Sequence, residues 1–301
     1  MKYYLILFIK GVGFGIANII PGVSGGTIAL ITRIYEELIF SLKSFDIKAL
    51  KLLISFDFRG LIKHINLYFL LAVFTGVIVS VFCTANLFKF LFTNYPILIW
   101  SFFFGLIAAS VYSVGKRITK WNSPNIIVLI IGCIMAISLL FVNPATENSN
   151  LFFIFICGII SVSGMLLPGL SGSFILILMG NYELLMVTAL AELNYLLLAL
   201  FLIGSVVGLL SFSHILAWLF KRHKNKILSL LTGFILGSLS LVWPWKKILK
   251  SIVVDGEEKI LRHHLYFPSI TEEDTLIAFA FIISGIVLVW VLESFSYKET
   301  V

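Results

Sequence analysis

The stretch Pro21-Gly-Val-Ser-Gly-Gly-Thr-Ile28 occurs again, slightly changed, as Pro168-Gly-Leu-Ser-Gly-Ser-Phe-Ile175. At the same spacing, Tyr35-Glu36 recurs as Tyr182-Glu183. Further along, a second constant spacing relates Gly76, Gly105 and Ser110 to Gly204, Gly233 and Ser238. Self-similarity of this kind indicates an internal repeat. The chain is therefore predicted to contain two copies of one structural unit.

The composition places most of this chain in lipid. Of its 301 residues, 60% are hydrophobic and only 12% are charged, against about 25% charged in a soluble domain. So few charges cannot cover the surface of a soluble globule. The net charge is +7, but the basic residues fall in short runs between apolar segments, as in cytoplasmic loops of membrane proteins. Nucleic acid is therefore not an expected partner.

Two of the ten apolar segments are too short to cross a membrane, which takes about 20 apolar residues. They follow the two repeated turns, where the apolar runs at 28–31 and 174–179 soon meet polar residues. Each is predicted to be a half-helix that turns back beside the segment before it. The result is a re-entrant helix hairpin in each copy, over residues 3–42 and 151–190.

The remaining segments complete the two repeats. The first, residues 1–145, is predicted to contain an amphipathic interfacial helix at about 43–65 and spans within 66–142. The second, residues 146–301, has its spans within 194–293. Three spans per copy is an odd number, and so the second copy enters the membrane upside down. The predicted fold is an all-α integral membrane protein of two inverted repeats, each a re-entrant hairpin plus three transmembrane helices.

The loop charges favour the same topology. Basic residues gather at 41–65, 116–120 and 221–226, whereas 143–150 and 191–194 have none. The first set is predicted to be cytoplasmic and the second external. The long loop 245–274 falls outside in this scheme although it has five basic residues, balanced by six acidic ones.

The repeated turns have the chemistry of an anion site. Proline ends the incoming helix, and Ser24 and Ser171 are natural N-caps of the outgoing half-helices. The first-turn amides then lack helical acceptors, and two such N-termini near the midplane would attract a phosphate. These donors belong to Gly25, Gly26 and Thr27 in the first copy and to Gly172, Ser173 and Phe174 in the second. Alternatively, each motif is only a tight turn whose amides are satisfied by neighbouring helices.

Other polar residues near the turns are candidates for supporting roles, each with a structural alternative. Lys10 lies on the approach to the first turn and could instead extend to the interface. Asn18 could bond the turn backbone, the ligand or a neighbouring helix. Glu36 and Glu183 could couple protons or gate the site, or simply lie at the interface, and Arg33 could recruit an anion or pair with Glu37. No catalytic residue, metal cluster or cofactor motif is found.

The segments KGVGFGIANIIPGVSGGTIALITRIYEEL (10–38) and GMLLPGLSGSFILILMGNYELL (164–185) resemble the DUF368 family of bacterial membrane proteins. The resemblance implies a flippase in the cytoplasmic membrane that returns polyprenyl phosphate, namely undecaprenyl phosphate, for reuse in cell-wall synthesis. Its partners would be this lipid and the surrounding membrane lipids. Arg33 departs from the family pattern, where glycine is expected. The matching positions are Lys10, Gly15, Asn18, residues 21–27, Tyr35, residues 168–173 and Tyr182-Glu183.

Two other functions fit parts of the sequence. Integral-membrane undecaprenyl-pyrophosphate phosphatases also use a PGxS turn, but there an arginine follows the serine, whereas here Gly25 and Gly172 follow it. Nor do the five histidines lie in the motifs, and so the parts for hydrolysis are missing. A secondary transporter of a small soluble anion would share the predicted architecture.

Overall fold

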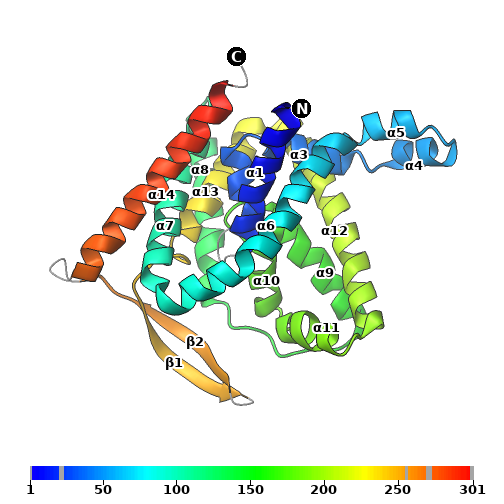
Figure 1. The fold of residues 1–301 in the computed structure, drawn as a ribbon. Coiled ribbons are helices and arrows are strands. Elements are labelled where there is room, and N and C mark those ends of the chain that lie inside the picture. Colours follow the sequence, from blue (N-terminus) through cyan, green and yellow to red (C-terminus); the bar gives the residue numbers. More distant parts are fainter. Residues whose placement is uncertain (1, 20–23, 255–256, 269–272, 299–301) are drawn as a thin grey trace.

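The computed structural model describes residues 2–19, 24–254, 257–268 and 273–298. They form a bundle of helices with both chain ends at one end and a two-stranded hairpin at the other (Figure 1). Five of the described helices are long and apolar enough to cross a membrane. The bundle is therefore that of a multi-pass, essentially all-helical membrane protein.

The helices follow the predicted order in both halves. The first half contains α1 (Lys2–Ile19), α2 (Gly25–Ile31), α3 (Tyr35–Lys43), α6 (Leu67–Asn94), α7 (Pro96–Gly115), α8 (Ser123–Ser138) and the 3-10 turn η1 (Leu139–Phe141). The second half contains α9 (Leu151–Leu166), α10 (Gly172–Leu178), the π-helical turn η2 (Leu184–Thr188), α11 (Ala189–Ala191), α12 (Tyr195–Arg222), α13 (Lys224–Ser238) and α14 (Glu273–Lys298). Both segments predicted to be half-helices, α2 and α10, are 7 residues long.

One predicted span is shorter than expected. The segment 227–243 forms α13, which has 15 residues and a length of about 22 Å. It ends at Ser238 because the backbone then turns, with the Leu241 amide donating to the Ser238 carbonyl at 2.9 Å. Most of α13 is buried, and so it lies inside the bundle and does not present a long face to lipid.

Four close helix pairs hold the bundle together. They are α1 with α6, α9 with α12, α7 with α14, and α8 with α13. Glycine lets the backbones approach: a Cβ at Gly76 of α6 would collide with the Phe8 carbonyl of α1, and one at Gly204 of α12 with the Phe155 carbonyl of α9. A Cβ at Gly105 of α7 would likewise collide with the backbone of α14, and one at Gly233 of α13 with the backbone of α8. Repeat-matched glycines therefore make matched contacts, and the two halves interlock.

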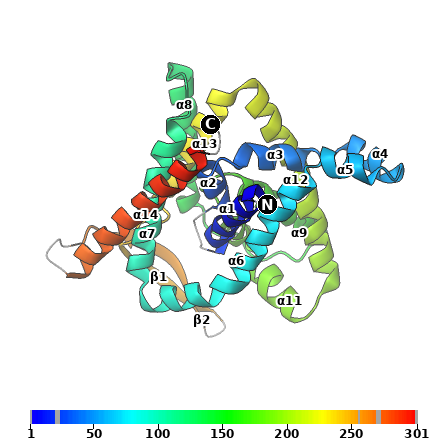
Figure 2. The same ribbon diagram turned by 45° about the horizontal axis from the view of Figure 1, so that its top comes forward.

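The two half-helices lie in the interior and are reached from opposite ends. The chain comes to α2 through α1 and leaves it through α3, from the end of the bundle with the termini. It comes to α10 through α9 and leaves it toward α11, from the other end (Figure 1). Figure 2 places α1 and α2 in the middle of the bundle. Every residue of α2 is buried, whereas α10 is mostly half-buried.

The interfacial helix predicted at about 43–65 is instead two short helices, α4 (Ile47–Ile54) and α5 (Phe58–His64), that project from the bundle (Figure 2). A single helix is interrupted because Phe56 has a left-handed backbone with φ 56° and Asp57 caps the new helix by accepting from the Gly60 amide. The apolar side chains of Ile47, Ile54 and Phe56 are exposed. This projection therefore keeps the amphipathic character predicted for it.

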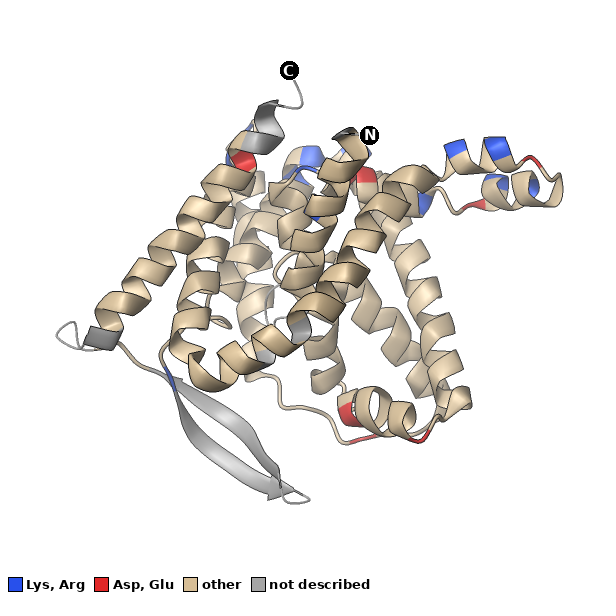
Figure 3. Ribbon diagram, in the orientation of Figure 1, with Lys and Arg blue, Asp and Glu red and all other residues tan. Residues whose placement is uncertain are grey.

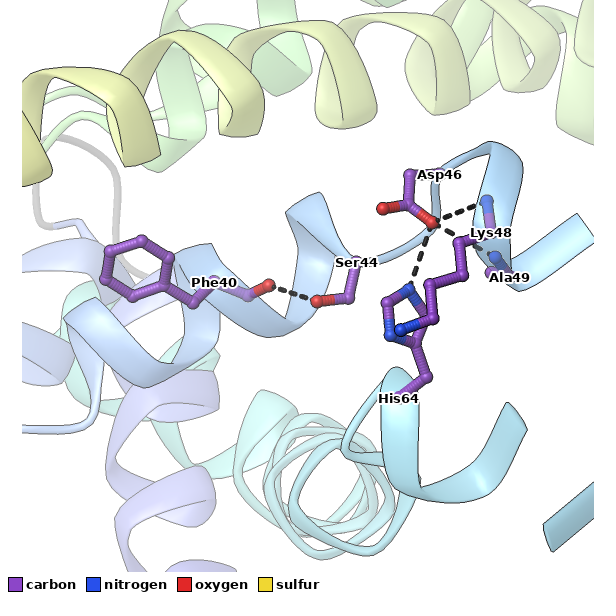
Figure 4. Close-up of polar contacts among 6 residues, drawn as sticks. All are labelled: Phe40, Ser44, Asp46, Lys48, Ala49 and His64. Carbon is purple, nitrogen blue, oxygen red and sulfur yellow. Dashed lines mark hydrogen bonds and ion pairs between the residues drawn. The ribbon is translucent and has the colours of Figure 1, made fainter. Parts of the chain in front are cut away.

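An aspartate fixes α4 against α5. The Asp46 carboxylate accepts from the amides of Lys48 and Ala49 and lies 3.0 Å from Nε2 of His64 (Figure 4). The His64 hydrogen bond, despite opposing desolvation, lowers the pKa of the Asp46 carboxyl below its ordinary value, and the two amides lower it further. Asp46 consequently stays ionised, and keeps its capping role, to a lower pH than an ordinary aspartate.

The two strands of the described structure lie in the loop 245–274. β1 (Lys246–Val254) pairs antiparallel with β2 (Glu257–Leu265), with Lys246 opposite Leu265. The hairpin lies at the end opposite the termini (Figure 1). Figure 3 shows Lys and Arg concentrated at the end with the termini, whereas acidic residues lie at both ends; those at the opposite end are in the segments beside α10 and α11, not in these helices.

Candidate functional site

The two repeated turns meet inside the bundle. The Ser24 hydroxyl, at the start of α2, donates to the Leu167 carbonyl at 3.2 Å. In return, the Gly169 amide of the second turn donates to the Thr27 hydroxyl at 3.2 Å. Ser24 and Thr27 are both 1% exposed. The sequence motifs, far apart along the chain, therefore form one continuous buried polar contact.

Tyr35 adds a third bond between the halves. Its hydroxyl donates to the Leu166 carbonyl at 2.7 Å, and its buried ring lies 5.7 Å from that of Phe220. Leu166 is the last residue of α9, whose final carbonyls have no helical donors. The sequence marks Tyr35 as a repeated position that also matches the family pattern, but it does not predict the bond that this residue makes across the halves.

The donors of the first turn are already occupied. The Gly25 amide donates to Oδ1 of Asn18 at 3.0 Å, and the Gly26 amide donates to the Ser24 hydroxyl at 3.2 Å. The Thr27 amide donates to the Ser24 carbonyl at 3.0 Å. The N-cap prediction for Ser24 is confirmed, and Asn18 binds the turn backbone. These three amides, which were expected to lack helical acceptors, find them in Asn18 of α1 and in the N-cap residue Ser24, as in the alternative of a satisfied turn.

The second turn is different. The Ser171 hydroxyl makes no capping bond to α10 and lies 2.7 Å from the Ser173 hydroxyl. Ser171 thus occupies the predicted N-cap position, but its hydroxyl does not make the expected capping bond because it is engaged with Ser173. Met165 occupies the position that corresponds to Asn18 and has no amide oxygen to offer. Among the described residues, none accepts a hydrogen bond from the backbone amides at 172–174.

The far ends of the half-helices differ in charge. Arg33 after α2 and Gly180 after α10 both have left-handed backbones, with φ 62° and 77°, which explains why glycine is the expected residue at position 33. Nη2 of Arg117 donates to the Ile31 carbonyl at 3.3 Å. Desolvation, and then the neighbouring charge of Arg33, lowers the Arg117 pKa. Two guanidinium groups therefore lie near the cytoplasmic mouth predicted from the loop charges.

Three predicted site residues do not reach the paired turns. Lys10 is half-buried on α1, eight residues before Asn18, or about 12 Å along the helix axis. Glu36 forms an ion pair with Lys224 at 2.8 Å, and Glu183 is exposed beside η2. The two glutamates thus lie at opposite outer ends of the hairpins. In the part of the chain that the structure describes, no group of His, Cys, Asp or Glu could hold a metal ion.

The Tyr35 bond can be tested by removing one atom. Tyr35→Phe leaves the buried Leu166 carbonyl without its donor, and we expect a loss of about 1–3 kcal/mol of stability, seen as a lower unfolding temperature in detergent. Tyr182→Phe is the matched control, because Tyr182 occupies the repeated position and is 38% exposed. Equal effects of the two substitutions would contradict a special role for Tyr35.

The fold and the paired turns define a multi-pass membrane protein with a buried polar contact between its two repeated turns. Residues 14–260 match the VCA0040-like, undecaprenyl phosphate translocase-like family, and the chain belongs to that family. A polyprenyl-phosphate transporter of Vibrio cholerae serotype O1 is 38% identical over 98% of this chain and 98% of its own length. A polyprenyl-phosphate transporter of Staphylococcus aureus is 29% identical over 81% of this chain and 87% of its own. No solved structure matches the chain.

Proposed function

We propose that this protein is a transporter that moves polyprenyl phosphate, such as undecaprenyl phosphate, across the bacterial cytoplasmic membrane. The observation that carries the proposal is the contact between the two repeated turns, which gathers hydroxyl and amide donors in a buried place. A phosphate monoester needs such donors once it leaves water, because charge-assisted hydrogen bonds replace its hydration. The family and the names of the two relatives support the choice of cargo.

The head group would first bind at the second turn. Ser171, Gly172 and Ser173 offer two hydroxyls and backbone amides there. Ser24 and Thr27 would join when their hydroxyls exchange Leu167 and Gly169 for phosphate oxygens. Gly25 and Gly26 would add their amides, with Asn18 positioning the first turn. Lys10 would add charge on the approach. The contact between the turns is then replaced by contacts to the ligand.

The movement would be a rocking of two inverted repeats, residues 1–145 and 146–301, around this site. The opposite approach of the two hairpins supports this arrangement (Figure 1). So do the repeat-matched glycine contacts, Gly76 with Gly204 and Gly105 with Gly233. The end rich in Lys and Arg would face the cytoplasm. Rocking would expose the head group to each side in turn while the isoprenoid chain stays in lipid.

Glu36 and Glu183 would gate the two mouths or carry protons, because they lie at the outer ends of the two hairpins. The Glu36 ion pair with Lys224 joins α3 to α13, so that its opening would free the cytoplasmic end of the first hairpin. Transport with and without an imposed proton gradient, in the wild type and in Glu36→Gln, tests the coupling. A gradient effect that disappears in the variant would assign the proton to this residue.

The proposed function is tested in liposomes that contain the purified protein and a labelled polyprenyl phosphate. We expect the label to change leaflets faster than in empty vesicles, and no acceleration would overturn the proposal. Polyprenyl pyrophosphate in the same vesicles should release no free phosphate, and release would favour an enzyme. Faster uptake of inorganic phosphate than of the lipid would favour a transporter of soluble anions.

A further inference from the structure

A second candidate site lies beside the β-hairpin, at the end of the bundle opposite the basic loops. A cavity of about 340 Å³ opens there between α7, the segment after α13 and the segment after β2. Four of its lining residues are aromatic. The rings of Phe104 and Trp243 lie 5.3 Å apart, as do those of Trp243 and Phe267. The lining residues are Phe104, Leu239, Ser240, Trp243, Tyr266 and Phe267.

This cavity suits an apolar group. Its polar atoms are already engaged, since the Ser240 hydroxyl donates to the Gly237 carbonyl at 2.7 Å and Nε1 of Trp243 donates to the Tyr266 carbonyl at 3.1 Å. Phe267 is 85% exposed, which is costly for a phenylalanine in water. An apolar chain in the cavity would cover this ring and the face of Trp243.

A lysine lies next to the aromatic cavity. The Lys246 ammonium is 4.6 Å from the ring centre of Trp100, which precedes Phe104 by one turn of α7 and therefore shares its face. The ammonium also donates to the Leu241 carbonyl. An ammonium has three donors, and no carboxylate among the described residues pairs with this one. Burial lowers the pKa of Lys246 to about 8.

The charge of Lys246 lies among aromatic side chains. Of the Lys and Arg residues in the 245–274 loop, it is the one whose side chain the structure describes. A partly buried cation is costly without an anionic partner. The aromatic cavity and this cation together match an amphiphile with an anionic head and an unsaturated chain.

We propose that Lys246 and the adjacent aromatic cavity form a capture site for an isoprenoid phosphate monoester on the face opposite the basic loops. The phosphate would bind the ammonium, and the first part of the chain would lie on Phe104, Trp243 and Phe267. The identity of this amphiphile rests on the proposed function, whereas the site itself rests on the cavity and the lysine. It would be an outer station, separate from the paired turns.

Calorimetric titration of the purified full chain in detergent tests this site. Farnesyl phosphate is the probe, with farnesol and inorganic phosphate as separate ligands. Lys246→Gln should weaken farnesyl phosphate binding at least about tenfold, the effect of one lost hydrogen bond to a charged group, and leave farnesol binding unchanged. Trp243→Ala should weaken both. Matched controls are Lys120→Gln and Trp121→Ala, because both side chains are exposed at the basic end, and neither should change binding.

The pH profile gives a readout that a merely structural lysine would not produce. Affinity should rise as the phosphate gains its second charge, near pH 6, and fall as pH passes about 8, where Lys246 loses its proton. Lys246→Arg should bind without the fall, since arginine stays charged. The described contacts of the ammonium are the Trp100 ring of α7 and the Leu241 carbonyl after α13, neither of which is a titratable group. The neighbouring residue Trp245 contacts Phe279 of α14 and accepts from the Tyr266 amide.

The outcomes separate this site from the proposed function. Unchanged farnesyl phosphate affinity in Lys246→Gln would overturn the capture site, as would equal affinity for inorganic phosphate and farnesyl phosphate. A variant with both Ser171 and Ser173 replaced by alanine should keep the Lys246-dependent binding, because its lesion is at the paired turns. Lys246-dependent binding in a protein that moves no lipid would uphold the capture site and reject the transporter. Phe267→Ala, at an exposed position, repeats the test of the cavity if Trp243→Ala fails to fold.

Discussion

Replacing Ser171 and Ser173 together by alanine is expected to lower the rate of polyprenyl phosphate transport at least about tenfold, with little change in unfolding temperature. Each hydroxyl is worth about 1.5–3 kcal/mol to a charged ligand. In the unliganded protein they bond to each other at 2.7 Å, and Ser171 does not cap α10. Removing both therefore costs ligand contacts and few folding contacts. Transport in liposomes and thermal unfolding in detergent are the two measurements.

Single substitutions test which residues at the two turns contribute most to head-group binding. Ser24→Ala or Ser171→Ala should weaken head-group binding more than Arg33→Ala, because Arg33 lies at the far end of α2. Ser24→Ala should also lower stability, by about 1 kcal/mol for a lost N-cap, as it removes the bonds to Gly26 and Leu167. If Arg33→Ala has the larger effect on binding, the turns are structural and the anion binds elsewhere.

Alanine at Gly76 or at Gly204 is expected to separate a helix pair and abolish transport. At either position the added methyl group would meet a carbonyl oxygen, that of Phe8 or of Phe155, on the neighbouring helix. Because that obstacle is backbone, the helix must move, and we expect a loss of about 1–3 kcal/mol. Size-exclusion profile and unfolding temperature in detergent measure it.

Gly115 is the matched control for these glycines. It lies at the end of α7 and is buried, but an added Cβ would meet only Thr232 and Trp121 side-chain atoms at 3.6 and 3.9 Å. Gly115→Ala should therefore be neutral or stabilising, because alanine favours helix more than glycine does. If Gly115→Ala lowered the stability as much as Gly76→Ala or Gly204→Ala, the effect of alanine at those two positions would have a cause other than the close approach of two helices.

The sequence was sufficient to locate the two turns, the half-helices and the loops. The repeated motif marked where the helices break, and scarce charges marked which loops share a side. The bonds between the halves could not be predicted, because the partners of Thr27 and Tyr35 are backbone atoms, Gly169 amide and Leu166 carbonyl, whose identity carries no signal in the sequence. Whether a turn's amides have acceptors depends on such contacts.

The differences between the two copies were also hidden. Both turns contain a serine at the N-cap position, yet Ser24 caps its helix and Ser171 does not. The break between α4 and α5 depends on a left-handed backbone at Phe56, a residue type that rarely adopts it. A helical pattern of apolar and charged residues continues through the break, and so periodicity alone predicted one helix.

The pairing of α7 with α14 has a consequence for biosynthesis. Gly105 and Gly285 lie against carbonyls of each other's helix, but α14 follows every other described helix along the chain. The small-residue face of α7 therefore stays in the translocon or in lipid, without its partner, until α14 has been inserted. A chain truncated before residue 273 would retain both turns and most spans, yet leave α7 without its partner. Assembly of the first half is therefore completed only after α14 has been synthesised and inserted.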